Sequence, residues 1–323
     1  FNGNQVDLNR DFPDLRDENW RAGVRQPETL AMMNFMQDLH LVLSANLHGG
    51  AEVVNYPWDT WNRLHADDAW YRQISRRYAD TAQYFGGPGY MTELNNGITN
   101  GYVWYPVFGG RQDYVNFFLH AREVTLEISM EKMPAESTLE NFWMGNRQSL
   151  LNFMGEALTG IAGVVTDSLT GAPLSAVITI KDHDKDNSQV YSSLASGMFF
   201  RMVAGGDNTL VFSAPNYLTK SVPVIFTGVG RVNADARLKP SSVSVFYPNP
   251  FSSQLNLYIS VPGDVLHIDL VDLSGRKALT ISQPVKVAGN QQVLVNGLAP
   301  GVYLVRGTYG DQIFREVLVH VNR

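Results

Sequence analysis

Helical periodicity ends at Gly160, and this limits the possible folds more than any other feature of the sequence. Residues 1–158 hold all six Trp and contain two amphipathic patterns of helical length. The first pattern follows Asp67, a predicted N-cap. Its apolar residues are Trp70, Ile74 and Tyr78, at i, i+4 and i+8. Helices are therefore expected only in the first part of a multidomain chain.

The second helical pattern follows a predicted capping box made by Ser137 and Glu140, and Gly160 is its expected stop. Its expected buried face consists of Leu150, Phe153, Met154 and Leu158. Apolar runs at 40–47 and 122–129 predict buried strands between the helices. Alternation of strands and helices indicates an α/β domain with a mixed sheet over residues 1–158.

Short alternating stretches separated by turn residues predict two small β-sandwiches after the helices, at 159–240 and 241–323. The strands of the last domain are expected from Tyr247 onward. One of them should carry Leu255, Leu257, Ile259 and Val261 on a single face.

Composition excludes several classes of partner. The 323-residue chain has a net charge of -6, which gives no reason to expect nucleic acid or an anionic membrane. No run of 18 apolar residues occurs, so no transmembrane segment is predicted. Because the sequence has no Cys, the domains must be held together by their cores, without disulfides.

His48 and Glu127 are polar residues inside predicted buried strands. His48 ends an apolar run, and ligands of open α/β sheets gather at the carboxyl ends of strands. Glu127 alternates with apolar residues, and a carboxylate there is costly to bury without a partner or a catalytic role. A hydrogen-bonded core residue is the alternative for either side chain.

Four segments are informative together: Asp-Leu-Asn-Arg at 7–10, Asn-Leu-His-Gly-Gly at 46–50, Asn-Gly-Tyr-Val-Trp-Tyr at 100–105 and Thr-Leu-Glu at 125–127. They resemble the active-site segments of zinc metallocarboxypeptidases of the regulatory N/E branch. Their order in the chain matches the order in that family.

The resemblance implies roles for individual residues. His48 corresponds to a zinc ligand of that family. Glu127 corresponds to the general base that accepts a proton from zinc-bound water. Asn9 and Arg10 correspond to the pair that binds the terminal carboxylate of a peptide, for which an Arg fork is suited. Tyr105 corresponds to the mobile tyrosine that closes over bound substrate.

Asp59 and Gln112 correspond to residues that face the side chain of the last substrate residue. An acidic group at this position implies selection of Lys or Arg by charge pairing. The alternative for Asp59 is a turn residue after Tyr-Pro-Trp at 56–58.

A catalytic zinc needs three protein ligands. The family supplies the other two from a His-x-x-Glu segment before the first motif, so they are expected upstream of Phe1. The chain is therefore expected to be N-terminally truncated and inactive as it stands. His120 and Glu123 match His-x-x-Glu formally but lie in the wrong place, and we expect them to bind no metal.

Residues 159–240 resemble the transthyretin-like domain that follows the catalytic domain in the N/E branch. The carrying segments are Gly-Val-Val-Thr-Asp at 163–167, Thr-Gly-Ala-Pro-Leu at 170–174 and Ser-Ala-Pro-Asn-Tyr at 213–217. Within this domain, residues 182–187 have the oxygen spacing of a calcium loop but lack its Gly and its distal Glu. A solvated hairpin tip is the expected structure there.

Residues 241–323 resemble the C-terminal sorting domain of the type IX secretion system. The carrying segments are Tyr-Pro-Asn-Pro-Phe at 247–251, Asp-Leu-Ser-Gly-Arg at 272–276 and Gly-Leu-Ala-Pro-Gly-Val-Tyr at 297–303. The resemblance implies contact with the type IX machinery. It also implies export across the outer membrane of a Bacteroidota-type cell, to the surface or the medium.

Together these features predict a secreted zinc carboxypeptidase that removes C-terminal Lys or Arg from peptides or proteins. One alternative is a hydrolase of cell-wall peptides, whose pocket would not favour Asp59. The other is an inactive relative that only binds peptide C-termini. Retention of Glu127 and Arg10 argues against an inactive protein.

Overall fold

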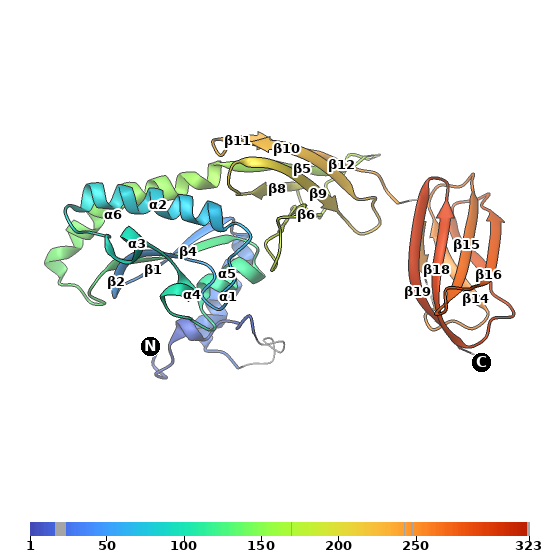
Figure 1. Cartoon of the computed structure of the whole chain (residues 1–323), viewed down its shortest axis with the longest axis horizontal. Coiled ribbons are helices and arrows are strands. Elements are labelled where there is room, and N and C mark those ends of the chain that lie inside the picture. Colours follow the sequence, from blue (N-terminus) through green and yellow to red (C-terminus); the bar gives the residue numbers. More distant parts are fainter. Residues whose placement is uncertain (17–23, 169, 242, 247, 322–323) are drawn as a thin grey trace. The chain divides into compact units, whose positions relative to one another are not determined.

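The computed structural model describes residues 1–16, 24–168, 170–241, 243–246 and 248–321, and for 243–246 it describes the backbone only (Figure 1). These residues divide into two compact units. The first comprises Phe1–Thr166, Gly171–Ser213 and Thr219–Arg237. The second comprises Asp167–Thr170, Ala214–Leu218 and Leu238–Arg323.

A mixed four-stranded sheet lies at the centre of the first part of unit 1. Its strands are β1 (Leu43–His48), β2 (Ala51–Tyr56), β3 (Ile98–Asn100) and β4 (Arg122–Ser129), in the order β1-β4-β2-β3. β1 and β4 are parallel, whereas β2 is antiparallel to β4. The parallel register sets His48 beside Glu127. The predicted mixed α/β domain and its two strands are confirmed. β4 is buried as predicted, but β1 is not, since none of its residues is fully buried and Leu47 is 57% exposed.

Helices cover both faces of this sheet (Figure 1). They are α1 (Pro27–Leu39), α2 (Asp68–Gly86), α3 (Glu93–Gly97), α4 (Gly101–Trp104), α5 (Arg111–Phe118) and α6 (Leu139–Gly155), with short 3₁₀ turns η1 (Leu8–Arg10), η2 (Glu136–Thr138) and η3 (Glu156–Leu158). α2 buries the predicted Trp70, Ile74 and Tyr78. These residues pack with Val124 and Leu126 of β4 in one apolar core.

The details predicted for the second helix are wrong in two respects. α6 begins at Leu139 after the turn η2, and no side chain caps it, so the capping box does not form. Phe153 is buried as predicted and Leu150 is partly buried, but the other buried residues are Gly145, Asn146 and Ser149. Met154 is 67% exposed and Leu158 is 75% exposed. The buried stripe uses small and polar residues because α6 packs closely on α2, where Ser149 donates a hydrogen bond to the Tyr78 carbonyl.

Residues 160–238 contain strands and no helix among those described. The strands are β5 (Gly160–Asp167), β6 (Val177–Ile180), β7 (Val190–Tyr191), β8 (Met198–Arg201), β9 (Gly206–Ser213), β10 (Lys220–Phe226), β11 (Arg231–Asn233) and β12 (Ala236–Leu238). They form one sheet in the order β10-β9-β6-β7 and another in the order β11-β5-β12, with β8 paired to β5. The loss of helices after Gly160 is as predicted.

Unit 2 contains the last strands of the chain. They are β13 (Val243–Phe246), β14 (Gln254–Ile259), β15 (Val265–Asp272), β16 (Lys277–Pro284), β17 (Gly289–Leu294), β18 (Gly301–Tyr309) and β19 (Gln312–His320), in sheets ordered β13-β14-β17 and β16-β15-β18-β19. β13 precedes Tyr247, the predicted start, which itself lies outside the described residues. Leu255, Leu257 and Ile259 are buried as predicted, but Val261 lies beyond the end of β14 and is 55% exposed.

Candidate functional site

One face of the paired strands β1 and β4 is polar along its length. Because side chains alternate along a strand, Asn46 and His48 of β1 share this face with Thr125 and Glu127 of β4. The opposite face carries residues such as Leu126, which belongs to the apolar core. The sheet therefore has an apolar face that packs into the core and a polar face that ends at His48 and Glu127.

His48 and Glu127 meet at the end of this polar face. His48 Nδ1 lies 3.8 Å from Glu127 Oε1. Burial raises the pKa of Glu127 to about 7, against the opposing effect of Lys132. Glu127 Oε2 is buried and has no hydrogen-bond partner. Burial also lowers the pKa of His48, and Arg111 adds to that effect. A carboxylate with this pKa can exchange a proton near neutrality.

The turn η1 presents Asn9 and Arg10. The Asp7 side chain accepts a hydrogen bond from the Asn9 backbone N–H, as an N-cap does. Asn9 Oδ1 accepts a hydrogen bond of 2.9 Å from the backbone N–H of Arg111. Arg10 is exposed, and its Nη1 donates to the Asn9 carbonyl at 2.9 Å. The same Nη1 lies 3.9 Å from Asp7 Oδ2.

A single cavity of about 620 Å³ joins these elements. Among its lining residues are the predicted Asn9, Arg10, His48, Tyr105 and Glu127. Tyr105 is 45% exposed, and burial followed by the charge of Glu127 raises its pKa. Lys132 also lines the cavity and was not predicted. Segments far apart in the sequence thus contribute to one site.

Asp59 and Gln112 do not line that cavity and form a second, buried cluster. Asp59 is 4% exposed, and its Oδ1 accepts from Gln112 Nε2 at 3.0 Å and from Asn55 Nδ2 at 2.9 Å. Burial and then the charge of Asp113 raise the pKa of Asp59 well above its usual value. The side-chain oxygens of Asn55 and Gln112 are buried without partners. Such a cluster offers several acceptors and would suit a ligand with several N–H donors.

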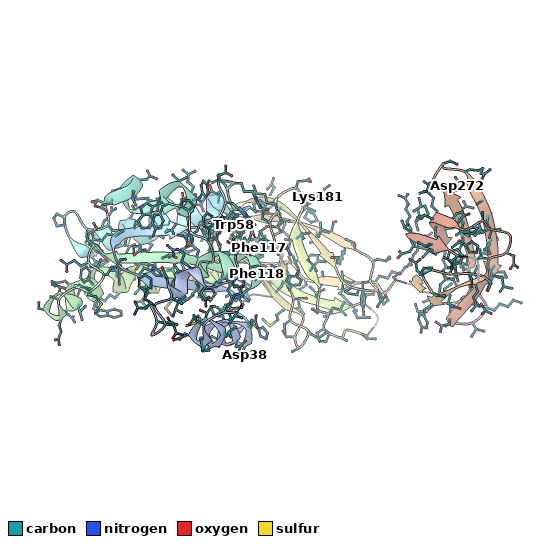
Figure 2. The ribbon with its side chains drawn as sticks, turned by 90° about the horizontal axis from the view of Figure 1, so that it is seen from below. Asp38, Trp58, Phe117, Phe118, Lys181 and Asp272 are labelled. Atoms are coloured by element: carbon teal, nitrogen blue, oxygen red, sulfur yellow. The ribbon has the colours of Figure 1, made fainter. Side chains whose placement is uncertain are left out.

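The loop that carries Asp59 is fixed by its neighbours. Asp113 accepts hydrogen bonds from the backbone N–H groups of Asp59 and Thr60, at 3.0 and 2.8 Å. Trp58 is fully buried, and its ring centroid lies 6.2 Å from that of Phe117; both residues are labelled in Figure 2. These contacts hold the carboxylate of Asp59 in place before any ligand binds.

Residues 2–149 match the family model described as zinc carboxypeptidase. The chain is also 33% identical over 280 residues to the catalytic chain of mouse carboxypeptidase N, an alignment that covers 76% of this chain and 59% of that protein. Residues 2–149 belong to the zinc carboxypeptidase family. Mouse carboxypeptidase M is 34% identical over 281 residues, covering 81% of this chain and 62% of that protein. Human carboxypeptidase D is 37% identical over 248 residues, covering 72% of this chain and 18% of that protein.

The chain thus spans less than two thirds of the length of each of these relatives. Residues 245–320 match the secretion system C-terminal sorting domain. This type IX sorting domain indicates export to the cell surface or the medium, as predicted. Among the helices of the described residues, none is long and apolar enough to cross a membrane.

Zinc is implied by the family, and the imidazole of His48 has the chemistry of a zinc ligand. Its Nδ1 faces Glu127, and its lowered pKa keeps the ring neutral, the form that binds metals. Among the described residues, no group of three His, Asp or Glu donors surrounds His48.

Asp67, His183 and Asp184 do bring donor atoms within 4.8 Å of one another. Both carboxylates are already paired with arginine. Asp67 accepts from Arg201 at 2.7 and 2.9 Å and from Arg122 at 3.0 Å, and Asp184 accepts from Arg201 at 2.6 Å. A metal ion would have to displace these guanidinium groups. We therefore interpret the cluster as a buried ion-pair network.

This network corrects two expectations. The 182–187 segment is not a solvated hairpin tip, because His183 Nε2 lies 2.8 Å from Asp67 Oδ1 and Asp184 pairs with buried Arg201. Asp67 precedes α2 as predicted, but its side chain makes no capping hydrogen bond, because the carboxylate accepts hydrogen bonds from Arg122 and Arg201 instead. The His120–Glu123 pair shares no site, since His120 contacts the Asn187 carbonyl and Glu123 pairs with Arg111.

Gly101 allows the close approach of Asp59. A Cβ added to Gly101 would lie 1.7 Å from Asp59 Oδ1 and 2.9 Å from Asn55 Oδ1. Gly101→Ala should therefore displace Asp59. Under the specificity proposed below, it should lower activity on peptides ending in Lys or Arg, with little effect on other peptides. Steady-state kinetics with peptides of different C-terminal residues would test this. Gly155→Ala, where an added Cβ meets nothing within 4 Å, is the matched control.

Proposed function

We propose that the parent protein is an exported metallocarboxypeptidase that hydrolyses the C-terminal peptide bond and releases Lys or Arg. The observation that carries the proposal is the cavity shared by Arg10, His48, Tyr105 and Glu127. A carboxylate-binding guanidinium, a metal ligand and a base with a raised pKa are the groups that this reaction needs.

In the proposed mechanism, Asn9 and Arg10 bind the terminal carboxylate, and Tyr105 closes over it. His48 would be one of three zinc ligands. When bound, zinc would polarise the scissile carbonyl and lower the pKa of the attacking water. Glu127 would accept the proton of that water and transfer it to the departing amine, as a general base and then a general acid.

The proposed preference for Lys or Arg rests on Asp59. A guanidinium or ammonium group entering the cluster would pair with this carboxylate and donate to the free oxygens of Asn55 and Gln112. An apolar side chain would leave the buried oxygens of Asn55 and Gln112 without partners, which is strongly unfavourable. Asn55 was not predicted from the sequence, although a polar residue in the buried strand β2 was a possible signal.

Asp59→Asn should lower kcat/KM for peptides ending in Lys or Arg by about 100-fold, because it removes one member of a desolvated charge pair. Activity on a peptide ending in Leu should change little. The measurement uses protein with a complete catalytic domain and peptides ending in Lys, Arg, Leu or Glu. If the unaltered enzyme prefers Leu or Glu, the role given to Asp59 is wrong.

The transthyretin-like assignment of residues 159–240 and the contact with the secretion machinery belong to the same proposal. The strands of residues 160–238 are compatible with the first, and the sorting domain supports the second.

A further inference from the structure

The sheet β16-β15-β18-β19 of unit 2 has one face packed in the core of that unit (Figure 1). Because side chains alternate along a strand, Leu270 and Val305 point into this core, whereas Asp269 and Arg306 point away from it. The face that carries Asp269 and Arg306 is called the outer face below. It has charged residues on all four strands.

Two arginines stand directly opposite each other on the outer face. The antiparallel register pairs Arg306 of β18 with Arg315 of β19, and both residues are exposed. Residues opposed in this way have Cβ atoms about 4.5–5.5 Å apart, and like charges at that spacing destabilise a sheet. The strand pair therefore contains a repulsion that a bound anion would remove.

The carboxylate in the same row of the sheet is already bonded to other donors. Asp269 pairs in register with Arg306. However, its Oδ2 lies 2.6 Å from Lys277 Nζ, and its Oδ1 accepts a hydrogen bond from Thr280 Oγ1 at 2.6 Å. The hydrogen bond from Lys277 is the main cause that lowers the pKa of Asp269. Among the described residues, no carboxylate forms a salt bridge with Arg306 or Arg315.

A hollow of about 330 Å³ lies at these two arginines. Lys277 and Asp269 also line it and balance each other in charge, so Arg306 and Arg315 leave the hollow positive. The whole chain, in contrast, has a net charge of -6. The positive potential is therefore a local feature of the outer face and does not follow from a basic composition.

The two guanidinium groups indicate which anion fits. Each is a planar fork that can bind two oxygens of one ligand. A carboxylate has two oxygens and a single charge, whereas a phosphate monoester has three terminal oxygens and a charge of about −1.5 to −2 near neutrality. Two forks side by side therefore match a phosphate monoester better. The hydroxyl of Thr308, which lines the same hollow, is a further donor.

We propose that Arg306 and Arg315 form a binding site for a phosphate monoester group on the outer face of unit 2. The group belongs either to a soluble phosphorylated molecule or to a lipid headgroup. Binding here is separate from the proposed peptidase reaction, because the strands of the site lie in unit 2 and the peptidase residues lie in unit 1.

The test uses the full chain at low ionic strength. Arg306→Gln and Arg315→Gln each remove one charge, and Arg306→Lys keeps the charge but loses the fork. Arg276→Gln is the control, because Arg276 is an exposed arginine of the same unit that pairs with Asp272 and does not line the hollow. Inorganic phosphate is titrated while the arginine Nε–H groups are observed by NMR. Acetate is titrated as the carboxylate for comparison.

We expect each Gln variant to weaken phosphate binding by about 10- to 100-fold, since charged hydrogen bonds are lost. Arg306→Lys should fall between these variants and the unaltered protein, and Arg276→Gln should match the unaltered protein. Acetate should bind the unaltered protein more weakly than phosphate does.

Stability should change in the opposite direction to binding. Without phosphate, both Gln variants should slow hydrogen exchange of the β18 and β19 amides by about 2- to 5-fold, because the repulsion between the arginines is removed. Arg306→Lys should not slow it, since the charge remains. Added phosphate should slow exchange in the unaltered protein but not in the Gln variants. Arginines with only a structural role would give faster exchange when replaced.

Vesicles distinguish the two sources of the phosphate group. Phosphatidic acid carries a phosphate monoester headgroup, so co-sedimentation with phosphatidylcholine vesicles only when they contain phosphatidic acid, and its loss in Arg306→Gln, would identify a lipid. Binding of inorganic phosphate without co-sedimentation would identify a soluble ligand.

The proposal is overturned if the unaltered protein binds neither inorganic phosphate nor these vesicles, or if acetate binds as tightly as phosphate. Equal phosphate binding by the unaltered protein and by folded Arg306→Gln and Arg315→Gln would overturn it too. Faster exchange in both Gln variants would contradict the repulsion on which the proposal rests. None of these results depends on whether the protein releases C-terminal residues from peptides.

Discussion

Glu127→Gln should lower kcat by about 10²- to 10⁴-fold, the range that a positioned general base contributes. The amide has nearly the same shape as the carboxylate but cannot accept the proton of water at neutral pH. Because Glu127 is proposed as a base and not as a ligand, zinc should stay bound. Turnover is measured with a peptide ending in Arg, and zinc content is measured by metal analysis of the same sample.

Loss of zinc in Glu127→Gln would contradict the assignment, since it would make Glu127 a ligand. Full activity would contradict it as well. Glu52→Gln is a suitable control, because Glu52 lies on β2, which also pairs with β4, but does not line the active-site cavity. The KM of the Glu127 variant should change far less than kcat, because the groups proposed to bind the peptide are intact.

Asp67→Asn should lower the free energy of unfolding of the first unit by about 3–5 kcal/mol, as expected when one partner of a buried ion pair is removed. Arg122 and Arg201 have exposed fractions of 1% and 0%, so their charges would remain buried with too few acceptors. Urea unfolding is followed by Trp fluorescence. All six Trp lie before residue 144, so this signal reports on the first unit.

Asp80→Asn is the matched control. Asp80 pairs with Arg76 on the surface of α2, with a side chain 58% exposed, so its loss should cost less than about 1 kcal/mol. An equal effect of the two substitutions would mean that the network around Asp67 contributes no special stability.

The pH dependence of the Asp67 effect follows from the same network. Burial alone would raise the pKa of Asp67, but Arg201 and Arg122 outweigh it and hold the pKa well below its usual value. A carboxyl group with a depressed pKa stabilises the fold above its unfolded pKa of about 4, and the stabilisation is lost as the pH falls below that value. The difference between Asp67→Asn and the unaltered protein should therefore be largest near neutrality and shrink in acid.

Local sequence patterns predicted the secondary structure well where a side chain's surroundings follow from its neighbours in sequence. The face of α2 that carries Trp70 and Tyr78 is an example, because large apolar residues at helical spacing must be buried together. The same reasoning failed for Met154, where α6 buries small and polar residues instead. Apolar spacing alone does not indicate how closely a neighbouring helix approaches.

The main residues of the candidate site were predicted from the order of four segments in the chain. The residues that surround them were not predicted. Nothing in the sequence indicates that Arg111 would meet Asn46, or that Lys132 would line the cavity. The same holds for Asp67 and Arg201, which are 134 positions apart. Charge pairs at such separations depend on tertiary folding, and sequence spacing carries no information about them.

The buried network around Asp67 limits where this protein can be divided. A shortened peptidase ending at Leu158 would leave buried Asp67 without Arg201. It would also leave Arg122, at the start of the strand that carries Glu127, without the Ser188 carbonyl to which it donates. Recombinant production of the peptidase alone should therefore end the chain after Leu238, where β12 finishes. For the same reason, exchange of modules between relatives during evolution should preserve residues 1–238 as one inherited block.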